Sequence, residues 1–308
     1  MQNKLTALLG VDYPLFQGGM AWISRAPLAA AVSNAGGLGV LSSVVDCPQA
    51  LRVEIQRVRA LTDRPFGVNL MMHSPFAAQA ARIVCEERVP VVTTGAGSPA
   101  EYMELWNSAG IHVIPVVATV NFARWMQREG ACAVIAEGCE AGGHIGDSST
   151  LCLVPQVCDA VDLPVIAAGG IADGRGMAAA MLLGAQGVQM GTRFLAAIEC
   201  GVHPAYVERV LQAKDTGTVV TGRLQGRPVR CLKTPLADRL LRDEPEGKSV
   251  YPAGGLRRAA AEGDAHEGWF LAGQAAGLVR RRMPAADIIH EVVADARRCL
   301  RRGASLAE

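Results

Sequence analysis

The sequence predicts an α/β protein built on a (β/α)8 barrel, with a smaller and mainly helical cap at its C-terminal end. Short aliphatic runs recur about every 25 residues, which is the spacing of βα units. These runs are apolar throughout instead of alternating, as expected for strands that are buried on both faces. Amphipathic stretches separate the runs, so that strands and helices take turns along the chain. Together these observations favour a closed parallel barrel.

Eight such runs lie in the first two-thirds of the chain and are the expected barrel strands. They cover residues 14–18, 38–42, 66–70, 89–93, 113–117, 133–137, 164–168 and 187–191. Among the intervening segments, residues 48–61 and 176–184 have helical patterns, and the second ends in Gly184, a helix C-cap signal.

The alternative fold is an open doubly wound sheet that binds a dinucleotide. Such a sheet would be expected to carry a G-x-G-x-x-G string that opens a helix after the first strand. The nearest string here is Gly95-Ala-Gly97-Ser-Pro, which lacks the third glycine. The barrel is therefore the preferred interpretation.

The repeating pattern ends near residue 200. We therefore expect a barrel over residues 1–200 and a cap over residues 201–308 that covers one barrel face. Within the cap, residues 218–222 and 227–232 are candidate strands, and the polar stretch 242–249 is a candidate loop. Helical patterns follow at 272–281 and 284–301, and the last helix is expected to pack back on the barrel.

Composition excludes several classes of protein. Of the 308 residues, 50% are hydrophobic and 19% are charged, so the chain can bury a large core and is not disordered. A net charge of +1 argues against a nucleic-acid partner. No apolar run approaches the roughly 20 residues of a membrane span, and the first residues lack the pattern of a signal peptide, so none is expected. The 9 cysteines form no C-x-x-C pair, which predicts reduced thiols and a cytoplasmic location.

In a barrel of this kind, function collects where the strands end at their carboxyl side. The seventh and eighth runs end in Gly169-Gly170 and in Gly191-Thr192. Glycines at these two positions predict a phosphate site, because free backbone N–H groups and a helix N-terminus attract an anion that can come close. The alternative is that the glycines only form tight turns.

No metal site is expected, because the strand ends carry no H-x-H, H-E-x-x-H or clustered carboxylates. A nucleophile elbow and a P-loop are also missing from the sequence. We therefore expect a phosphate-bearing organic cofactor to supply the chemistry. Pyridoxal phosphate would need a lysine at a strand end, and none is present there, so flavin mononucleotide (FMN) fits better.

His144 is the titratable side chain most suited to catalysis, because it lies in the glycine-flanked string Glu140-Ala-Gly-Gly-His-Ile-Gly after the sixth run. An imidazole there could donate a proton or hold a carbonyl oxygen. The alternative is a surface histidine without function. Of the other histidines, His73 is a candidate for lining a pocket and His203 for capping a helix, whereas His112, His266 and His290 are assigned to the surface or to packing.

The sequence resembles the FMN-dependent enoyl-[acyl-carrier-protein] reductases of type II, within the wider nitronate monooxygenase superfamily. Matching strings occur in family order along nearly the whole chain. They cover residues 12–22, 34–39, 64–69, 91–97, 135–146, 165–174, 189–194 and 272–279. The string Ala-Gly-Gly-His-Ile-Gly is closer to the reductase branch than to the monooxygenases.

The resemblance implies an FMN in the mouth of the barrel. It assigns the phosphate to Gly169, Gly170, Gly191 and Thr192. The ring and ribityl chain would lie near Gly19, Met20, Asn69, Glu137, Gly142 and Gly143, and His144 matches the active-site histidine.

The activity implied by the resemblance is reduction of the 2,3-double bond of enoyl-acyl-carrier-protein, or of a related enoyl thioester, by NAD(P)H in fatty-acid synthesis. Some relatives respond to monovalent cations, and a homodimer is expected. The alternative is a nitronate monooxygenase that oxidises alkyl nitronates with O₂. A barrel that binds FMN or another phosphate ligand without catalysis is a third possibility. Two departures from the family pattern, a shortened segment at 243–252 and Trp269-Phe270 before Ala272, affect the cap and therefore the choice of substrate.

Overall fold

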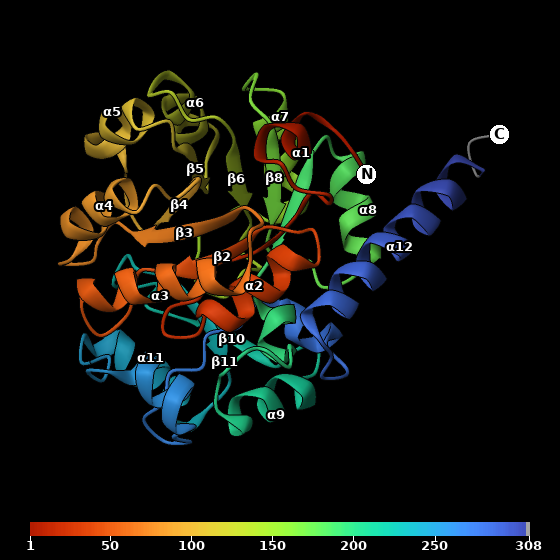
Figure 1. Cartoon of the computed structure of the whole chain (residues 1–308). Coiled ribbons are helices and arrows are strands. Elements are labelled where there is room, and N and C mark those ends of the chain that lie inside the picture. Colours follow the sequence, from red (N-terminus) through yellow and green to blue (C-terminus); the bar gives the residue numbers. More distant parts are fainter. Residues whose placement is uncertain (306–308) are drawn as a thin grey trace.

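The computed structural model describes residues 1–305 and has eight parallel strands arranged as a barrel (Figure 1). The strands are hydrogen-bonded in the order β1-β9-β8-β6-β5-β4-β3-β2. Between the first and the last of these, a single bridge from Phe16 to Leu38 closes the ring. The strands are β1 (Leu15–Gln17), β2 (Gly39–Ser42), β3 (Phe66–Met71), β4 (Val91–Gly95), β5 (His112–Val117), β6 (Val134–Glu137), β8 (Val165–Ala168) and β9 (Gly187–Met190). Each of the eight predicted runs is thus a barrel strand.

Helices follow the strands and form the outer layer of the barrel (Figure 1). They are α2 (Ala26–Asn34), α3 (Pro48–Leu61), α4 (Ala77–Glu86), α5 (Ala100–Ser108), α6 (Val120–Arg128), α7 (Thr150–Cys158) and α8 (Gly174–Leu182). The predicted helix over 48–61 is α3. The one predicted over 176–184 begins two residues earlier as α8 and is followed by Gly184 at φ +102°, in the left-handed region that favours glycine.

The interior of the barrel is filled by aliphatic side chains, and its amino-terminal end is plugged by the short helix α1 (Lys4–Leu9). Leu5 of α1 is fully buried and lies so close to Gly187 that a Cβ there would come within 2.7 Å of its Cδ2 atom. A larger apolar core lies between the strands and the outer helices. Because one end is plugged, the carboxyl end of the barrel remains for the site.

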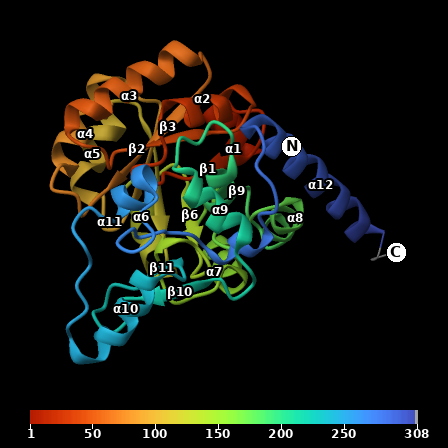
Figure 2. The same cartoon turned by 90° about the horizontal axis from the view of Figure 1, so that it is seen from below.

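Residues 201–305 contribute most of the elements on the other side of this mouth (Figures 1 and 2). They contain α9 (Pro204–Gln212), β10 (Thr218–Thr221), β11 (Val229–Leu232), α10 (Pro235–Asp243) and α11 (Gly255–Arg257). A π-helical turn follows at Arg258–Glu262. Strand β11 pairs both with β10 and with β7 (Gly143–His144), which belongs to the loop after β6. The loop that carries His144 is therefore tied to the cap by backbone hydrogen bonds.

The helix predicted over 272–281 is wrong. The structure has a short 3₁₀ turn there, Gln274–Leu278, preceded by extended backbone at Gly273. The reason is tight packing: a Cβ on Gly273 would lie 2.5 Å from the Glu140 carbonyl oxygen, and one on Gly277 would lie 3.1 Å from that of Lys214. The segment is held by the neighbouring loops, and its local helical pattern is overridden.

The polar stretch 242–249 is only partly the loop that its composition predicts. Helix α10 continues to Asp243, and a 3₁₀ turn covers Glu244–Glu246. Glu244 is buried and accepts hydrogen bonds from the backbone N–H groups of Gly222 and Leu224. A carboxylate that satisfies two amides orders a segment whose composition is that of a loop.

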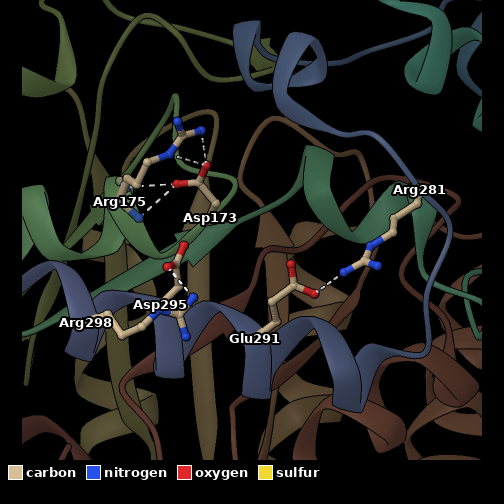
Figure 3. Close-up of polar contacts among 7 residues, drawn as sticks. Asp173, Arg175, Arg281, Glu291, Asp295 and Arg298 are labelled. Carbon is tan, nitrogen blue, oxygen red and sulfur yellow. Dashed lines mark hydrogen bonds and ion pairs between the residues drawn. The ribbon is translucent and has the colours of Figure 1, made fainter.

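The last helix, α12 (Ala285–Ala304), packs against α2 and α8, and its final turns extend beyond the body of the protein (Figures 1 and 2). The contact with α8 is close, since a Cβ on Gly174 would lie 2.3 Å from the Ala296 backbone nitrogen. Three ion pairs surround this contact (Figure 3): Asp173–Arg175, Arg281–Glu291 and Asp295–Arg298. Within residues 1–305, no helix is both long enough and apolar enough to cross a membrane.

Candidate active site

Two adjoining cavities lie at the carboxyl ends of the strands, one of about 510 Å³ and one of about 100 Å³. Five residues line both: Gly19, Met20, Glu137, Gly142 and Gln189. The cavities are therefore two parts of one site, and all eleven residues predicted from the sequence line one or both of them. The large part has mostly apolar walls, whereas the small part has mostly glycine and alanine walls.

The small cavity is formed by the loops after β8 and β9. Gly169 and Gly170 adopt φ values of +96° and +72°, in the left-handed region that favours glycine. Within residues 1–305, the N–H groups of Gly169, Gly170 and Gly191 donate no hydrogen bond, so they are available to a ligand. No lysine or arginine is among the residues that line this cavity. An anion here would be held by backbone dipoles and by a hydroxyl group.

Glycine is required at several of these positions for steric reasons. A Cβ on Gly169 would lie 2.8 Å from the Thr150 hydroxyl oxygen, and one on Gly142 would lie 2.6 Å from the Ala272 carbonyl carbon. A Cβ on Gly19 would come within 2.2 Å of the Asn69 Cβ. Gly191 differs, because the nearest atom to a Cβ there is the Met20 side chain at 3.9 Å. At Gly191 a side chain would meet no protein atom and would instead occupy the cavity.

Two amides at the N-terminus of α8 are not available to an anion. The Asp173 carboxylate accepts hydrogen bonds from the N–H groups of Arg175 and Gly176 at the start of that helix. These amides are consequently satisfied by their own N-cap and cannot bind the anion. The free donors belong to the glycine loop itself, one turn earlier in the chain.

Glu137 ends β6 and lines both cavities. Burial raises the pKa of its carboxyl group to about 7. None of the side-chain hydrogen bonds found within residues 1–305 involves this carboxylate, and the side chain keeps partial exposure towards the cavities. A buried carboxyl group without a protein partner is suited to bind hydroxyl groups of a ligand.

Gln189 in β9 is a site residue that sequence reasoning missed. Its Oε1 atom is buried and has no hydrogen-bond partner within the described part of the chain, and its side chain lines both cavities. A polar atom left unsatisfied in this way indicates a missing N–H or O–H donor from a ligand. The available signal was its position near the carboxyl end of the eighth strand, two residues before Gly191.

His144 lies in β7, where it is the Cα partner of Val229 in β11. This residue lines the large cavity and is exposed to solvent. Partial burial, together with the positive charges of His73 and Arg227, holds the pKa of this imidazole below its usual value of 6.5. A neutral imidazole at neutral pH can accept a hydrogen bond or donate one.

Two other histidines, His73 and His203, lie outside both cavities. His73 does not line either cavity, so that expectation is wrong; its ring lies against Gly97, which does line the large cavity. His203 caps α9 as predicted, with Nδ1 accepting a hydrogen bond of 3.2 Å from the Ala205 N–H.

The cap that the sequence predicts over residues 201–308 supplies a roof to the site. Tyr206, Leu256, Trp269 and Leu271 line the large cavity from the side opposite the barrel strands. Gly273 and Ala275 complete the small cavity. These residues come from three separate segments of the cap, and only the folded chain brings them to the barrel mouth.

The arrangement fits FMN. A large cavity with apolar walls suits a planar ring system, and the glycine-lined cavity that adjoins it suits a phosphate group. The unsatisfied Gln189 oxygen, the unpartnered Glu137 carboxyl and the open space at Gly191 all lie along this path. No group of three or more potential metal ligands occurs among residues 1–305.

The chain is similar to several known proteins. A family model described as "Nitronate monooxygenase" matches residues 2–295. FabK of Thermotoga maritima has a similar structure, with a TM-score of 0.97 and 47% identity over 99% of both chains. A (3aS,4S,5R,7aS)-5-hydroxy-7a-methyl-1-oxo-octahydro-1H-indene-4-carboxyl-CoA dehydrogenase of Mycobacterium tuberculosis is 42% identical, over 78% of this chain and 68% of that protein. A probable nitronate monooxygenase of Staphylococcus saprophyticus is 34% identical, over 98% of this chain and 99% of that protein.

Proposed function

The chain belongs to the nitronate monooxygenase family, whose members are FMN-dependent oxidoreductases, and we propose that it reduces the 2,3-double bond of an enoyl thioester with NAD(P)H. The observation that carries the proposal is the joined pair of cavities with His144 at the rim of the larger one. Support comes from the likeness to FabK, an enoyl-acyl-carrier-protein reductase II. The Mycobacterium tuberculosis relative is also named for a thioester, in that case of CoA.

We assign the residues of the small cavity to the phosphate of FMN. The N–H groups of Gly169, Gly170 and Gly191 and the hydroxyl group of Thr192 would bind it. The Glu137 carboxyl would accept hydrogen bonds from ribityl hydroxyl groups, and the Gln189 oxygen would accept one from the ring. When bound, FMN supplies hydride transfer from the nicotinamide to the substrate.

His144 would act at the thioester. Its imidazole can donate a hydrogen bond to the carbonyl oxygen, where negative charge develops as the β-carbon is reduced, and it can deliver the proton to the α-carbon. The roof of Leu256, Trp269 and Leu271 would exclude water from the reacting carbons. Met20, Asn69, Gly19, Gly142 and Gly143 would shape the ring site.

The proposal extends to partners that no contact in the structure tests. We propose an acyl-carrier-protein-linked enoyl thioester as substrate, a homodimeric assembly, a response to monovalent cations and a cytoplasmic location. The second candidate function is a nitronate monooxygenase, which is favoured by the full-length likeness to the Staphylococcus saprophyticus protein.

An anaerobic two-step experiment separates the candidates. FMN-loaded protein is mixed first with NADH and then with crotonyl thioester, and the flavin absorbance is followed. A reductase bleaches with NADH and recovers its colour with the thioester. If NADH does not bleach the flavin, or if crotonyl thioester does not restore it, the reductase proposal fails. Turnover of a nitroalkane anion with O₂ and without nicotinamide would support the monooxygenase instead.

A further inference from the structure

The roof of the large cavity contains a braced aromatic pair. Trp269 lines the cavity, and its indole lies against the ring of Tyr251, with centroids 4.5 Å apart and an interplanar angle of 31°. The Tyr251 hydroxyl group lies 3.5 Å from the Thr221 hydroxyl in β10, which anchors the second ring. The Tyr251 ring therefore supports the indole on the side away from the cavity, whereas the half-buried indole faces the cavity itself.

The backbone on both sides of Trp269 is also fixed. The Trp269 N–H donates to the Gly255 carbonyl at 2.9 Å, and the Phe270 carbonyl accepts from the Leu232 N–H at 2.8 Å. The next carbonyl, that of Leu271, accepts from the Tyr206 hydroxyl at 2.7 Å. Phe270 is fully buried and its ring packs edge-on against Tyr206 with centroids 4.8 Å apart. Hydrogen bonds and ring packing therefore hold the backbone of this part of the roof in place.

The space below this wall is limited and apolar. Glu137 and His144 are the only titratable acid and base among the residues that line the large cavity, apart from the Tyr206 phenol. The remaining walls suit an aliphatic chain, because they include Ile23, Val44, Met71, Phe122, Leu256 and Leu271. The large cavity, with a volume of about 510 Å³, must hold both the flavin ring and the reacting part of the substrate. Little length is left for a long acyl chain.

We propose that Trp269 sets the acyl-chain length of the substrate and restricts the site to thioesters of short-chain acyl groups. This inference rests on the proposed function for the identity of the substrate, but its physical content is a binding preference. The indole occupies space at the cavity wall that further methylene groups would need. A smaller side chain at this position would open the cavity towards Tyr251 and admit them.

The test uses FMN-loaded wild-type protein and the series Trp269→Phe, Trp269→Leu and Trp269→Ala. Calorimetry measures the binding of butyryl-, octanoyl- and dodecanoyl-CoA, which are saturated and cannot be reduced. We expect the wild type to bind butyryl-CoA tightest and the preference to shift towards longer chains as the side chain becomes smaller. Each newly buried methylene group contributes about fourfold in affinity, so Trp269→Ala is expected to raise the octanoyl-to-butyryl affinity ratio by at least about tenfold. Turnover of the matching enoyl thioesters is measured in parallel.

The matched control is Trp125→Ala, because Trp125 lies on α6, is 37% exposed and does not line the cavity. This variant is expected to keep the wild-type chain-length profile. A wild type that binds dodecanoyl-CoA as tightly as butyryl-CoA would overturn the inference, as would an unchanged ratio in Trp269→Leu and Trp269→Ala. The Trp269→Phe variant and the wild-type profile remain informative if the smallest side chain prevents folding. Chain-length-dependent binding without any thioester reduction would refute the proposed function and leave the inference standing.

Discussion

The hydroxyl oxygen of Thr192 accepts a hydrogen bond from the backbone N–H of Gly273 over 2.9 Å, although 81 positions separate the two residues. Both line the small cavity. This bond connects the loop after β9 to the cap directly at the candidate phosphate site. Because the N–H of Gly273 uses an acceptor lone pair of the hydroxyl, the hydroxyl proton remains free to be donated to an anion.

Replacing Thr192 with valine is expected to weaken FMN binding by about 10- to 100-fold, because a hydrogen bond to a charged group is lost. Fluorescence titration of FMN-free protein measures the affinity. Thr94→Val is the matched control, since Thr94 is buried, its hydroxyl oxygen has no partner within residues 1–305, and it lines neither cavity. Equal FMN affinity in the Thr192→Val variant and the wild type would argue against the phosphate assignment.

The Gly191→Ala variant separates folding from cofactor binding. No protein atom lies closer than 3.9 Å to the added methyl group, so the FMN-free variant is expected to unfold at the wild-type temperature. The methyl group would occupy the phosphate cavity and weaken FMN binding by roughly tenfold or more. Gly201→Ala is the control, because Gly201 also has open space around it but lies outside both cavities. A loss of thermal stability without a loss of FMN affinity would contradict the assignment.

Glu137 predicts a pH dependence of stability in the FMN-free protein. Its pKa is raised from 4.5 to about 7 in the folded state by burial, so the folded protein binds this proton more tightly than the unfolded chain does. Stability is therefore expected to fall as the pH rises from below 4.5 through about 7, by about 3 kcal/mol for this group. Urea unfolding at about pH 5 and about pH 8 measures this difference.

The Glu137→Gln variant should lose this part of the pH dependence, because the amide does not titrate. Glu104→Gln, which changes an exposed glutamate on α5, should keep it. The explanation would be wrong if the wild type and Glu137→Gln showed the same change in unfolding free energy between the two pH values.

His144→Gln is expected to slow reoxidation of the reduced flavin by crotonyl thioester by about 100-fold or more, while NADH still bleaches the flavin at the wild-type rate. The wild-type thioester rate should decrease as the pH rises through the lowered pKa of His144, below 6.5, because the protonated acid is then lost. His290→Gln, at an exposed position away from the cavities, should behave as the wild type. Stopped-flow absorbance separates the two half-reactions. Equal slowing of both half-reactions would place His144 at the flavin and not at the thioester.

Local sequence patterns were sufficient to predict the strands and helices of the barrel. Each strand is a short aliphatic run, such as Val134–Glu137, and helices such as Pro48–Leu61 are amphipathic over their whole length. These patterns depend only on residues a few positions apart, so they can be detected in the sequence without the structure. The glycines at 169, 170 and 191 could be placed as well, because barrel geometry gathers all strand ends at one face.

Other parts of the site depend on contacts between distant segments. Residues 272–281 have a helical pattern but adopt a short 3₁₀ turn, because Gly273 and Gly277 pack against the Glu140 and Lys214 carbonyls. Two backbone N–H groups at the start of α8 are also unavailable to a ligand, because in the structure they donate to the Asp173 carboxylate.

The sequence by itself determined the order of the elements and the residues at the strand ends, since both follow from local periodicity and from the geometry of a parallel barrel. Only the tertiary structure decided which cap residues form the roof, that the side-chain oxygen of Gln189 is left without a hydrogen-bond partner, and how far burial shifts the pKa of Glu137. These properties arise from the packing and desolvation of groups that are far apart in the chain, and no local pattern encodes them.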